Sequence, residues 1–344
     1  MSDTESETAT SSVSWPLLNP EPMDPQLTTI QPGGGVVIKL EMLWGKFRRT
    51  WLKIFRKGYV RRMQELRKGS VNPCPHDVLD PRDLKFYQNQ EGYYWEKEDD
   101  PFTGRDRIPF ARVGLAELLV FSLMFFLPPL ILIPILIGKA LSFWVIFGWL
   151  VVVASLVKGG LIVWFFRDPE RPVPTEPGLV VSPADGKLVL IEEIEHDEQI
   201  GGPAILFGIF LSIFNVHMNR SPIEARVIGL TYKPGKYLNA LRPESAKENE
   251  QLAVKIQELS VPHRPMIVRQ ITGAIARRIV CWLKPGDLLN RGERFGMIKL
   301  GSRTELVLPR EAGMEIVAQL GQNIKAGKSI MVRYKSEESA PGND

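Results

Sequence analysis

The chain has 344 residues, of which 44% are hydrophobic and 24% are charged, and its formal net charge is +4. These totals are those of an ordinary globular protein with room for two or three compact units. The only cysteines, Cys74 and Cys281, form no CxxC pair and have no histidine cluster nearby. The sequence therefore predicts neither a disulfide framework nor a zinc site, and no metal is expected.

Residues 1–38 are predicted to form a disordered tail. The first 30 residues are rich in Ser, Thr, Glu and Pro, and they lack the basic start and apolar core of a signal peptide. The Pro-Gly-Gly-Gly run from Pro32 to Gly35 adds a flexible break.

The next region, residues 39–112, is basic and polar. Between Lys39 and Lys68 it carries eleven Lys or Arg against two Glu, interleaved with large apolar residues. This pattern predicts a basic amphipathic helix suited to an anionic membrane surface. A solvated helix packed on the rest of the protein and a nucleic-acid-binding helix are the alternatives. The hydrophobic segment that follows favours the membrane interpretation, so we expect no nucleic-acid partner. The function of residues 39–112 stays open.

Residues 113–166 are predicted to form a transmembrane helical hairpin. Leu115 to Gly138 is long enough to span a bilayer, and a second uncharged segment follows from Ala140 to Val157. Three prolines interrupt the first segment, which membrane helices tolerate. A re-entrant hairpin is the alternative. Positive charges flank both outer ends, which places those ends in the cytoplasm: Arg105, Arg107, Arg112, Lys158, Arg167 and Arg171.

From residue 167 to the end, short β-branched runs alternate with turn residues, which predicts a mainly β domain. One helix is expected, over Ser245–Leu259. The spacing Gly-x5-Gly occurs at Gly286–Gly292 and again at Gly321–Gly327. It is similar to the turn-and-return strands of lipoyl- and biotinyl-carrier barrels. The predicted fold class is α+β, with a mainly β catalytic domain that contains carrier-like barrel elements, preceded by the transmembrane hairpin.

Three short stretches of this domain carry candidate chemistry. Asp185 lies in a Ser-Pro-Ala-Asp-Gly turn, His217 follows an apolar run, and Ser302 follows Gly301 near a predicted strand. Each alone is more often structural: a turn, a core histidine or a bulge. Together, an Asp, a His and a Ser can form an activated nucleophile. Their chain order and the absence of a nucleophile elbow do not match the common hydrolases.

Four stretches in fixed order resemble phosphatidylserine decarboxylases of the shorter bacterial branch. The resemblance covers about half of the chain, and the hydrophobic hairpin ahead of it is also similar to the family. The stretches are Phe165-Phe-Arg-Asp-Pro-Glu-Arg, Ser182-Pro-Ala-Asp-Gly, Asn215-Val-His-Met-Asn-Arg and Phe295-Gly-Met-Ile-Lys-Leu-Gly-Ser.

This resemblance implies a self-cleaving proenzyme. Ser302 would attack the carbonyl of Gly301, with His217 taking the proton and Asp185 orienting the imidazole. The products would be chains 1–301 and 302–344, which stay associated, the second beginning with a pyruvoyl group made from Ser302. That cofactor would form a Schiff base with phosphatidylserine and release CO2 to leave phosphatidylethanolamine. The implied location is the inner cell membrane, with the catalytic domain on its cytoplasmic face.

Two features depart from the longer branch of that family. The longer branch has a second histidine at the position where this chain has Phe214, so no role of that histidine can be assigned to this chain. The loop Pro234–Ala240, with Asn249-Glu250, resembles the family's substrate loop, although Arg242-Pro243 replaces a different pair. The candidates for headgroup binding are Lys236, Tyr237 and Asn239, and a solvated loop is the alternative.

Two other functions compete with this interpretation. A pyruvoyl enzyme acting on a soluble amino acid or nucleoside needs no membrane hairpin. A non-catalytic membrane adaptor that binds lipid or a partner needs no intact Gly301–Ser302 pair, nor Asp185 and His217 beside it. The sequence therefore favours the decarboxylase.

Overall fold

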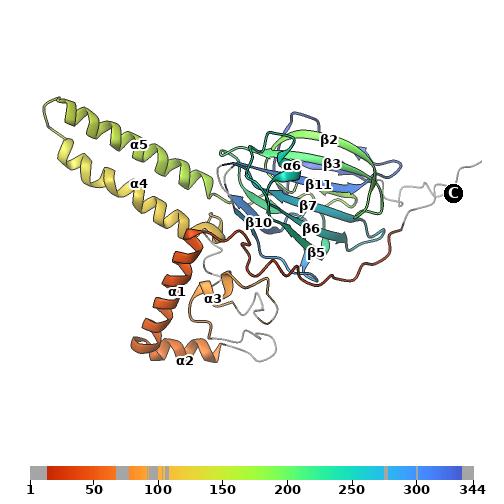
Figure 1. The fold of residues 1–344 in the computed structure, drawn as a ribbon, viewed down its shortest axis with the longest axis horizontal. Helices are drawn as coiled ribbons and strands as arrows, with labels where there is room; N and C mark the ends of the chain where they lie inside the picture. Colours follow the sequence, from red (N-terminus) through yellow and green to blue (C-terminus); the bar gives the residue numbers. More distant parts are fainter. Residues whose placement is uncertain are drawn as a thin grey trace, which may run out of the picture.

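The computed structural model describes residues 14–66, 77–90, 92, 100–102, 104, 108–274, 278–299 and 301–334. These residues form a β-rich domain, a helical hairpin that projects from it, and a group of shorter helices at the base of the hairpin (Figure 1). Residues 1–13 of the predicted tail, Cys74, and the flanking arginines 105 and 107 lie outside the described residues.

Residues 14–35 run along the β-rich domain as an ordered strap. The Glu21 N–H donates to the Ile228 carbonyl (2.7 Å), and the Cys281 N–H donates to the Ile30 carbonyl (2.8 Å). Leu27 and Ile30 are buried in the hydrophobic core. The prediction of disorder is therefore wrong for this part of the tail. Leu27 and Ile30 pack into the hydrophobic clusters of the domain, and hydrogen bonds to the domain satisfy several backbone groups of the strap.

Three helices follow the strap, namely α1 (Val36–Phe55), α2 (Lys57–Glu65) and α3 (Pro81–Lys85). The basic amphipathic helix predicted from the sequence is thus present, as two helices that meet at Arg56. The short α3 begins with a capping box. The Asp80 side chain accepts the backbone N–H of Asp83, and the Asp83 side chain accepts the backbone N–H of Asp80. Ion pairs from α1 to α3 hold the group together.

The hairpin consists of α4 (Leu115–Leu136) and α5 (Phe143–Phe165), preceded by a 3-10 turn at Arg112–Gly114. Both helices are long and apolar enough to cross a membrane. At 1.5 Å per residue, a helix of this length is about 33 Å long, close to the thickness of a bilayer core. Only 6% and 11% of their most apolar windows are buried. This is the opposite of what a core helix of a soluble protein shows.

The β-rich domain contains three sheets. The largest has the order β13-β2-β3-β11-β7-β6-β5-β9, and the two smaller sheets have the orders β4-β10-β8 and β1-β14-β12. The strands are β1 Leu179–Val181, β2 Gly186–Asp197, β3 Gly202–Leu211, β4 Met218–Arg220, β5 Ala225–Lys233, β6 Gln251–Glu258, β7 Pro265–Ile271, β8 Arg278–Cys281, β9 Leu288–Leu289, β10 Arg294–Lys299, β11 Ser302–Pro309, β12 Glu315–Ile316, β13 Asn323–Ile324 and β14 Ile330–Arg333.

The predicted helix Ser245–Leu259 is wrong for most of its length. The helix α6 covers only Ser245–Glu248, and the rest is strand β6. Leu252, Val254 and Ile256 are buried between β5 and β7. Their spacing of two residues is that of a strand, and burial in the sheet outweighs the helix propensity of the surrounding Lys, Gln and Glu.

The mainly β architecture predicted for the catalytic domain is confirmed. All four glycines of the repeated Gly-x5-Gly spacing have a positive φ, between 71° and 93°. Each therefore adopts the left-handed turn conformation that glycine favours. The similarity to carrier-protein barrels stays a prediction.

Candidate active site

The candidate cleavage site lies at a corner between two sheets. Gly301 stands between β10 of a small sheet and β11, and Ser302 is the first residue of β11 in the middle of the large sheet. Gly301 has φ 63°, a conformation that a residue with a Cβ rarely adopts. Ser302 is fully buried, and its Oγ has no hydrogen-bond partner among the residues described. A buried hydroxyl without a partner is costly, which suggests a chemical use.

The carbonyl group of Gly301 packs directly against Gly273, which follows strand β7. A Cβ built on Gly273 would lie 1.7 Å from the Gly301 oxygen, and 3.6 Å from the Cβ of Ala240. No other amino acid fits at this position without moving the carbonyl. Gly273 therefore determines where the carbonyl that Ser302 would attack can sit.

His217 lies just before β4 and is fully buried. Its backbone carbonyl accepts the Ile298 N–H of β10 (3.2 Å), and its Nδ1 is 2.9 Å from the Asn215 carbonyl. Because a carbonyl can only accept, Nδ1 carries the proton and Nε2 has a free lone pair. Nε2 is buried and, within the described part of the chain, makes no hydrogen bond. Burial lowers the pKa of His217 to about 4, so the imidazole is neutral at physiological pH.

A buried polar contact joins the two segments that carry His217 and Ser302. Asn219 Nδ2 donates to Thr304 Oγ1 (3.1 Å), and Gln270 Nε2 donates to Asn219 Oδ1 (2.9 Å). His217 lies two residues before Asn219, and Ser302 lies two residues before Thr304. The contact thus brings the start of β4 next to the start of β11. His217 Nε2 and Ser302 Oγ each lack a hydrogen-bond partner among the described residues, so they are not hydrogen-bonded to each other in this structure. A neutral base and a nucleophilic hydroxyl are the kinds of group that proton transfer requires.

Asp185 occupies the turn between β1 and β2, as predicted, but its contacts differ from the expectation. Its carboxylate forms a bidentate ion pair with Arg171, in which Nη2 is 2.8 Å from Oδ2, and it accepts the Ala326 N–H (2.9 Å). The imidazole is therefore oriented by the hydrogen bond that its Nδ1–H donates to the Asn215 carbonyl, and not by Asp185. The negative charge of Asp185 still raises the pKa of His217, against the larger effect of burial.

The candidate substrate loop ends near Gly273, since the Cβ of Ala240 lies 3.6 Å from where a Cβ on Gly273 would be. The buried Asn249 side chain holds the loop: its Oδ1 accepts the Leu238 N–H (2.7 Å), and its Nδ2 donates to the Leu238 carbonyl (2.9 Å) and to the Thr272 carbonyl (2.7 Å). Loop and cleavage site are thus tied to the same turn after β7.

The three headgroup candidates differ in their surroundings. Lys236 is exposed, and its Nζ pairs with Glu248 (2.8 Å). Asn239 Oδ1 accepts the Leu241 N–H (3.1 Å) and so stabilises the turn. The side chain of Tyr237 faces the buried Glu250; burial raises the pKa of Glu250, while hydrogen bonds from Tyr232 and Tyr237 lower it.

The base of the hairpin contacts the same site from both helices. The Phe165 ring at the end of α5 lies 4.5 Å, centroid to centroid, from the His217 ring. Glu117 in the first turn of α4 forms a buried ion pair with Lys299, three residues before Ser302. The sequence singled out neither contact, because each joins residues far apart in the chain. Gly273 and the partnership of Arg171 with Asp185 were missed for the same reason.

Comparison with known proteins gives the family. The model of the phosphatidylserine decarboxylase family matches residues 159–332. A phosphatidylserine decarboxylase proenzyme of Rhodopirellula baltica is 50% identical over 252 residues, which are 73% of this chain and 99% of that protein. This chain belongs to the phosphatidylserine decarboxylase family. A proenzyme of the same name from Syntrophus aciditrophicus is 38% identical, over 67% of this chain and 96% of its own length.

As a member of this decarboxylase family, the chain is an enzyme, and the proenzyme names of its relatives imply maturation by self-cleavage. The part that matches the family model contains the whole candidate site, from the end of α5 to β14. The helices α1 to α4 precede it. The family match thus covers the chemistry but not the helices beside the base of the hairpin.

Proposed function

We propose that this chain is a proenzyme that cleaves itself between Gly301 and Ser302, converts Ser302 to a pyruvoyl group, and decarboxylates phosphatidylserine to phosphatidylethanolamine. The observation that carries the proposal is the buried Ser302 Oγ, which has no hydrogen-bond partner among the described residues. It lies in the stretch where the chain resembles its proenzyme relatives. Asp185 and His217 complete the proposed machinery.

In the first step, Ser302 Oγ attacks the carbonyl carbon of Gly301, and Nε2 of His217 accepts the hydroxyl proton. The peptide bond breaks as the amine of residue 302 takes up a proton, which leaves an ester between the two residues. Loss of the α-proton of residue 302 then expels the carboxylate of Gly301. Water hydrolyses the resulting dehydroalanine with release of ammonia, and the pyruvoyl group remains on chain 302–344.

Asp185 contributes through its charge. When His217 accepts a proton, an imidazolium forms in a buried site, and the carboxylate of Asp185 stabilises it. The ion pair with Arg171 holds that carboxylate in place. The two chains stay together after cleavage because β11 remains hydrogen-bonded between β3 and β7.

When present, the pyruvoyl group supplies a ketone that condenses with the substrate amine and takes up the electron pair released with CO2. Ser302 and His217 are both fully buried, and this burial keeps water away from the reacting groups. His217 is the group that we propose returns a proton. Lys236, Tyr237 and Asn239 are the proposed headgroup contacts, and the exposed ammonium of Lys236 suits the phosphate.

The substrate is a membrane lipid, and the hairpin provides access to it. We propose that residues 113–166 cross the inner membrane and that the catalytic domain, residues 167–344, lies on the cytoplasmic face. Residues 1–112 lie on that face too, since α1 to α3 and the β-rich domain share one end of the hairpin (Figure 1).

The test is to purify the protein from membranes and measure its intact mass and its activity. We expect two chains, 1–301 and 302–344, with a carbonyl-reactive label only on the smaller one. Carboxyl-labelled phosphatidylserine should release CO2, whereas free serine should not. Ser302→Ala should stay a single chain and release none. An uncleaved wild-type chain, as expected of a membrane adaptor, would contradict the proposal.

A further inference from the structure

The helix α1 carries a stripe of large apolar side chains that point away from the protein. Members of the stripe are spaced three or four residues apart, or stand side by side, so they share one face of the helix. Each is between 43% and 69% exposed. The α1 stripe consists of Val36, Leu40, Leu43, Trp44, Phe47, Trp51, Ile54 and Phe55. Soluble proteins rarely leave such a continuous apolar surface uncovered.

The opposite face of α1 is fixed to the protein, so the stripe cannot turn inward. Ile38 and Leu52 are buried. Lys85 of α3 pairs with the buried Glu41 (3.0 Å), and Arg49 pairs with Asp83. A rotation of α1 that hid the stripe would bring these pairs into water or break them.

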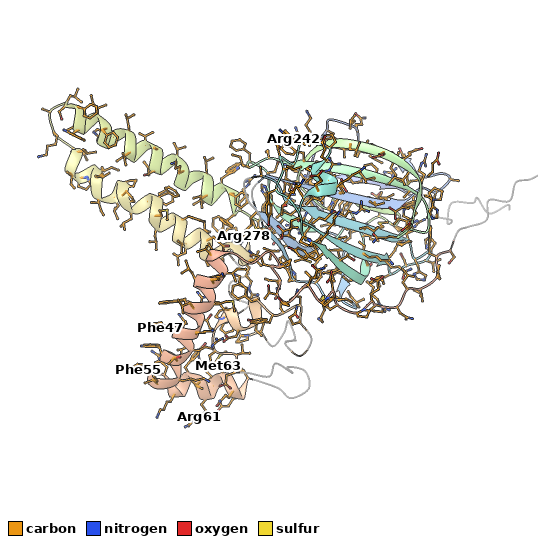
Figure 2. All side chains as sticks on the ribbon, in the orientation of Figure 1. Phe47, Phe55, Arg61, Met63, Arg242 and Arg278 are labelled. Atoms are coloured by element: carbon orange, nitrogen blue, oxygen red, sulfur yellow. The ribbon has the colours of Figure 1, made fainter. Side chains whose placement is uncertain are left out.

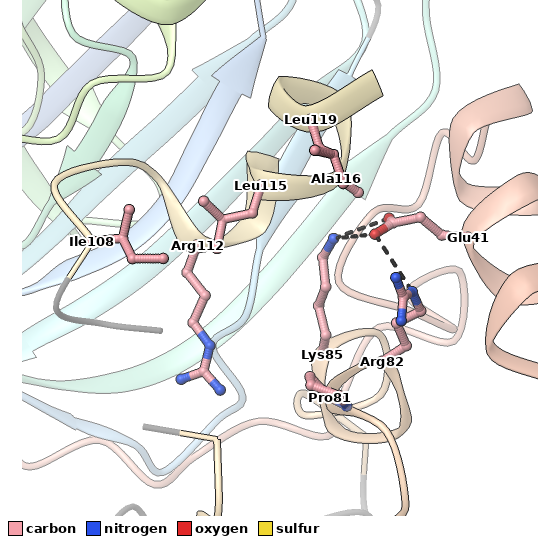
Figure 3. A pocket seen from close by; sticks show the side chains of 9 residues that line it. All are labelled: Glu41, Pro81, Arg82, Lys85, Ile108, Arg112, Leu115, Ala116 and Leu119. Atoms are coloured by element: carbon pink, nitrogen blue, oxygen red, sulfur yellow. Dashed lines mark hydrogen bonds and ion pairs between the residues drawn. The ribbon is translucent and has the colours of Figure 1, made fainter. Parts of the chain in front are cut away.

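The position of α1 relative to the hairpin identifies what covers the stripe. A cavity of about 300 Å³ separates α1 and α3 from the first turns of α4, lined by Glu41 and Lys85 on one side and Leu115 and Leu119 on the other (Figure 3). The helix α1 thus starts beside the base of the hairpin. From there it runs across the direction in which the hairpin projects (Figure 1).

The stripe faces the side on which the hairpin extends. Figure 2 shows Phe47 and Phe55 on the side of α1 away from the β-rich domain. If the hairpin crosses a bilayer, α1 lies in the plane of its surface with these rings toward the lipid. Basic side chains accompany the stripe: Lys39, Lys46, Arg56, Lys57, Arg61 and Arg62 of α1, α2 and their junction are all exposed. Such a charge pattern fits anionic headgroups.

We propose that α1 is an interfacial helix, whose apolar stripe inserts between the lipids of the anionic membrane leaflet that the catalytic domain faces. The inference rests on the hairpin spanning the bilayer, which is part of the proposed function. The interfacial helix would add a second membrane contact and so hold the catalytic domain at a defined orientation to the lipid surface.

The test uses the full-length chain in vesicles of phosphatidylcholine and phosphatidylglycerol, with an environment-sensitive fluorophore at one engineered cysteine. The background carries Cys74→Ser, and the remaining Cys281 is buried. Phe47→Cys places the dye on the stripe. Lys53→Cys is the matched control, on the same helix but turned toward Asp77 (3.1 Å). Leu123→Cys, an exposed position of α4, reports on the hairpin. Lipids that carry a quencher near the headgroup or deep in the acyl chain give the depth.

We expect several-fold stronger quenching at position 47 than at position 53, mainly by the shallow quencher, and weaker quenching at 47 in vesicles of phosphatidylcholine alone. Position 123 should respond to the deep quencher. Equal quenching at 47 and 53 would overturn the interfacial helix even when 123 is deep. A blue-shifted dye at 47 that no lipid quenches would show that protein covers the stripe and would overturn it too. A shallow signal at 123 would instead refute the spanning hairpin of the proposed function.

Discussion

The close approach of Gly273 to the Gly301 carbonyl leads to a quantitative prediction for Gly273→Ala. The new Cβ would lie 1.7 Å from the Gly301 oxygen, whereas real Cβ contacts below 3.0 Å are essentially never seen. The oxygen or the turn after β7 must therefore move by about 1.3 Å at least, even for a tight contact, or by nearer 1.7 Å to reach the ordinary separation of about 3.4 Å between carbon and oxygen.

One of the two groups that can move is the carbonyl that Ser302 is proposed to attack, and the other is the turn against which that carbonyl packs. A misplacement of about 1 Å between reacting groups can cost about a hundredfold in rate. We therefore expect Gly273→Ala to slow self-cleavage by about a hundredfold or more. The assay is a pulse of radiolabelled amino acid during cell-free synthesis into vesicles, followed by timed quenching and separation of the 1–301 and 302–344 chains. Gly58→Ala in α2 is the matched control, because its added Cβ would meet no atom within 4 Å among the described residues outside its own stretch of helix.

A folding defect must be separated from a chemical one. Gly273→Ala is therefore combined with Ser302→Ala, and its thermal unfolding is compared with that of Ser302→Ala alone, since neither chain can mature. Similar unfolding temperatures together with slow cleavage of Gly273→Ala would support the positioning argument. Cleavage within threefold of the wild-type rate would refute it, and so would a loss of cleavage fully explained by unfolding.

Four further predictions follow from the same contacts. Because His217 acts as a neutral base and burial lowers its pKa to about 4, self-cleavage should be constant from about pH 8 to pH 5 and fall about tenfold per pH unit below its pKa; a midpoint near 6.5 would contradict this. Phe165→Ala lets water reach the imidazole, raises its pKa toward the ordinary value, and should move that fall in rate to higher pH. Glu117→Gln leaves the buried Lys299 ammonium unpaired and should lower the free energy of unfolding by about 3–5 kcal/mol, measured by thermal unfolding in detergent, while Glu117→Leu with Lys299→Met should restore it. His217→Ala, assayed for CO2 release per pyruvoyl group formed, should lose about a hundredfold or more; unchanged turnover would limit His217 to maturation.

Features encoded by neighbouring residues could be predicted from the sequence. The helices α4 and α5 are predominantly apolar, with Glu117 and Lys158 as their charged residues, and the amphipathic spacing of α1 is visible in one stretch of chain. The turn that carries Asp185 and the Gly301–Ser302 pair were also found locally. In each case the signal lies within a few residues, so no knowledge of distant contacts is needed.

What only the tertiary structure decided depends on residues far apart in the chain. Residues 251–258 carry enough Lys, Gln and Glu to suggest a helix, and become strand β6 because β5 and β7 flank them. Leu27 and Ile30 order the strap only where a core exists to receive them. Arg171 forms an ion pair with Asp185, and Gly273 packs against the Gly301 carbonyl. Both contacts join residues too far apart in the chain for a local sequence pattern to reveal them. Burial and sheet register are properties of the assembled domain, so the partners of each site residue are determined only when the chain has folded.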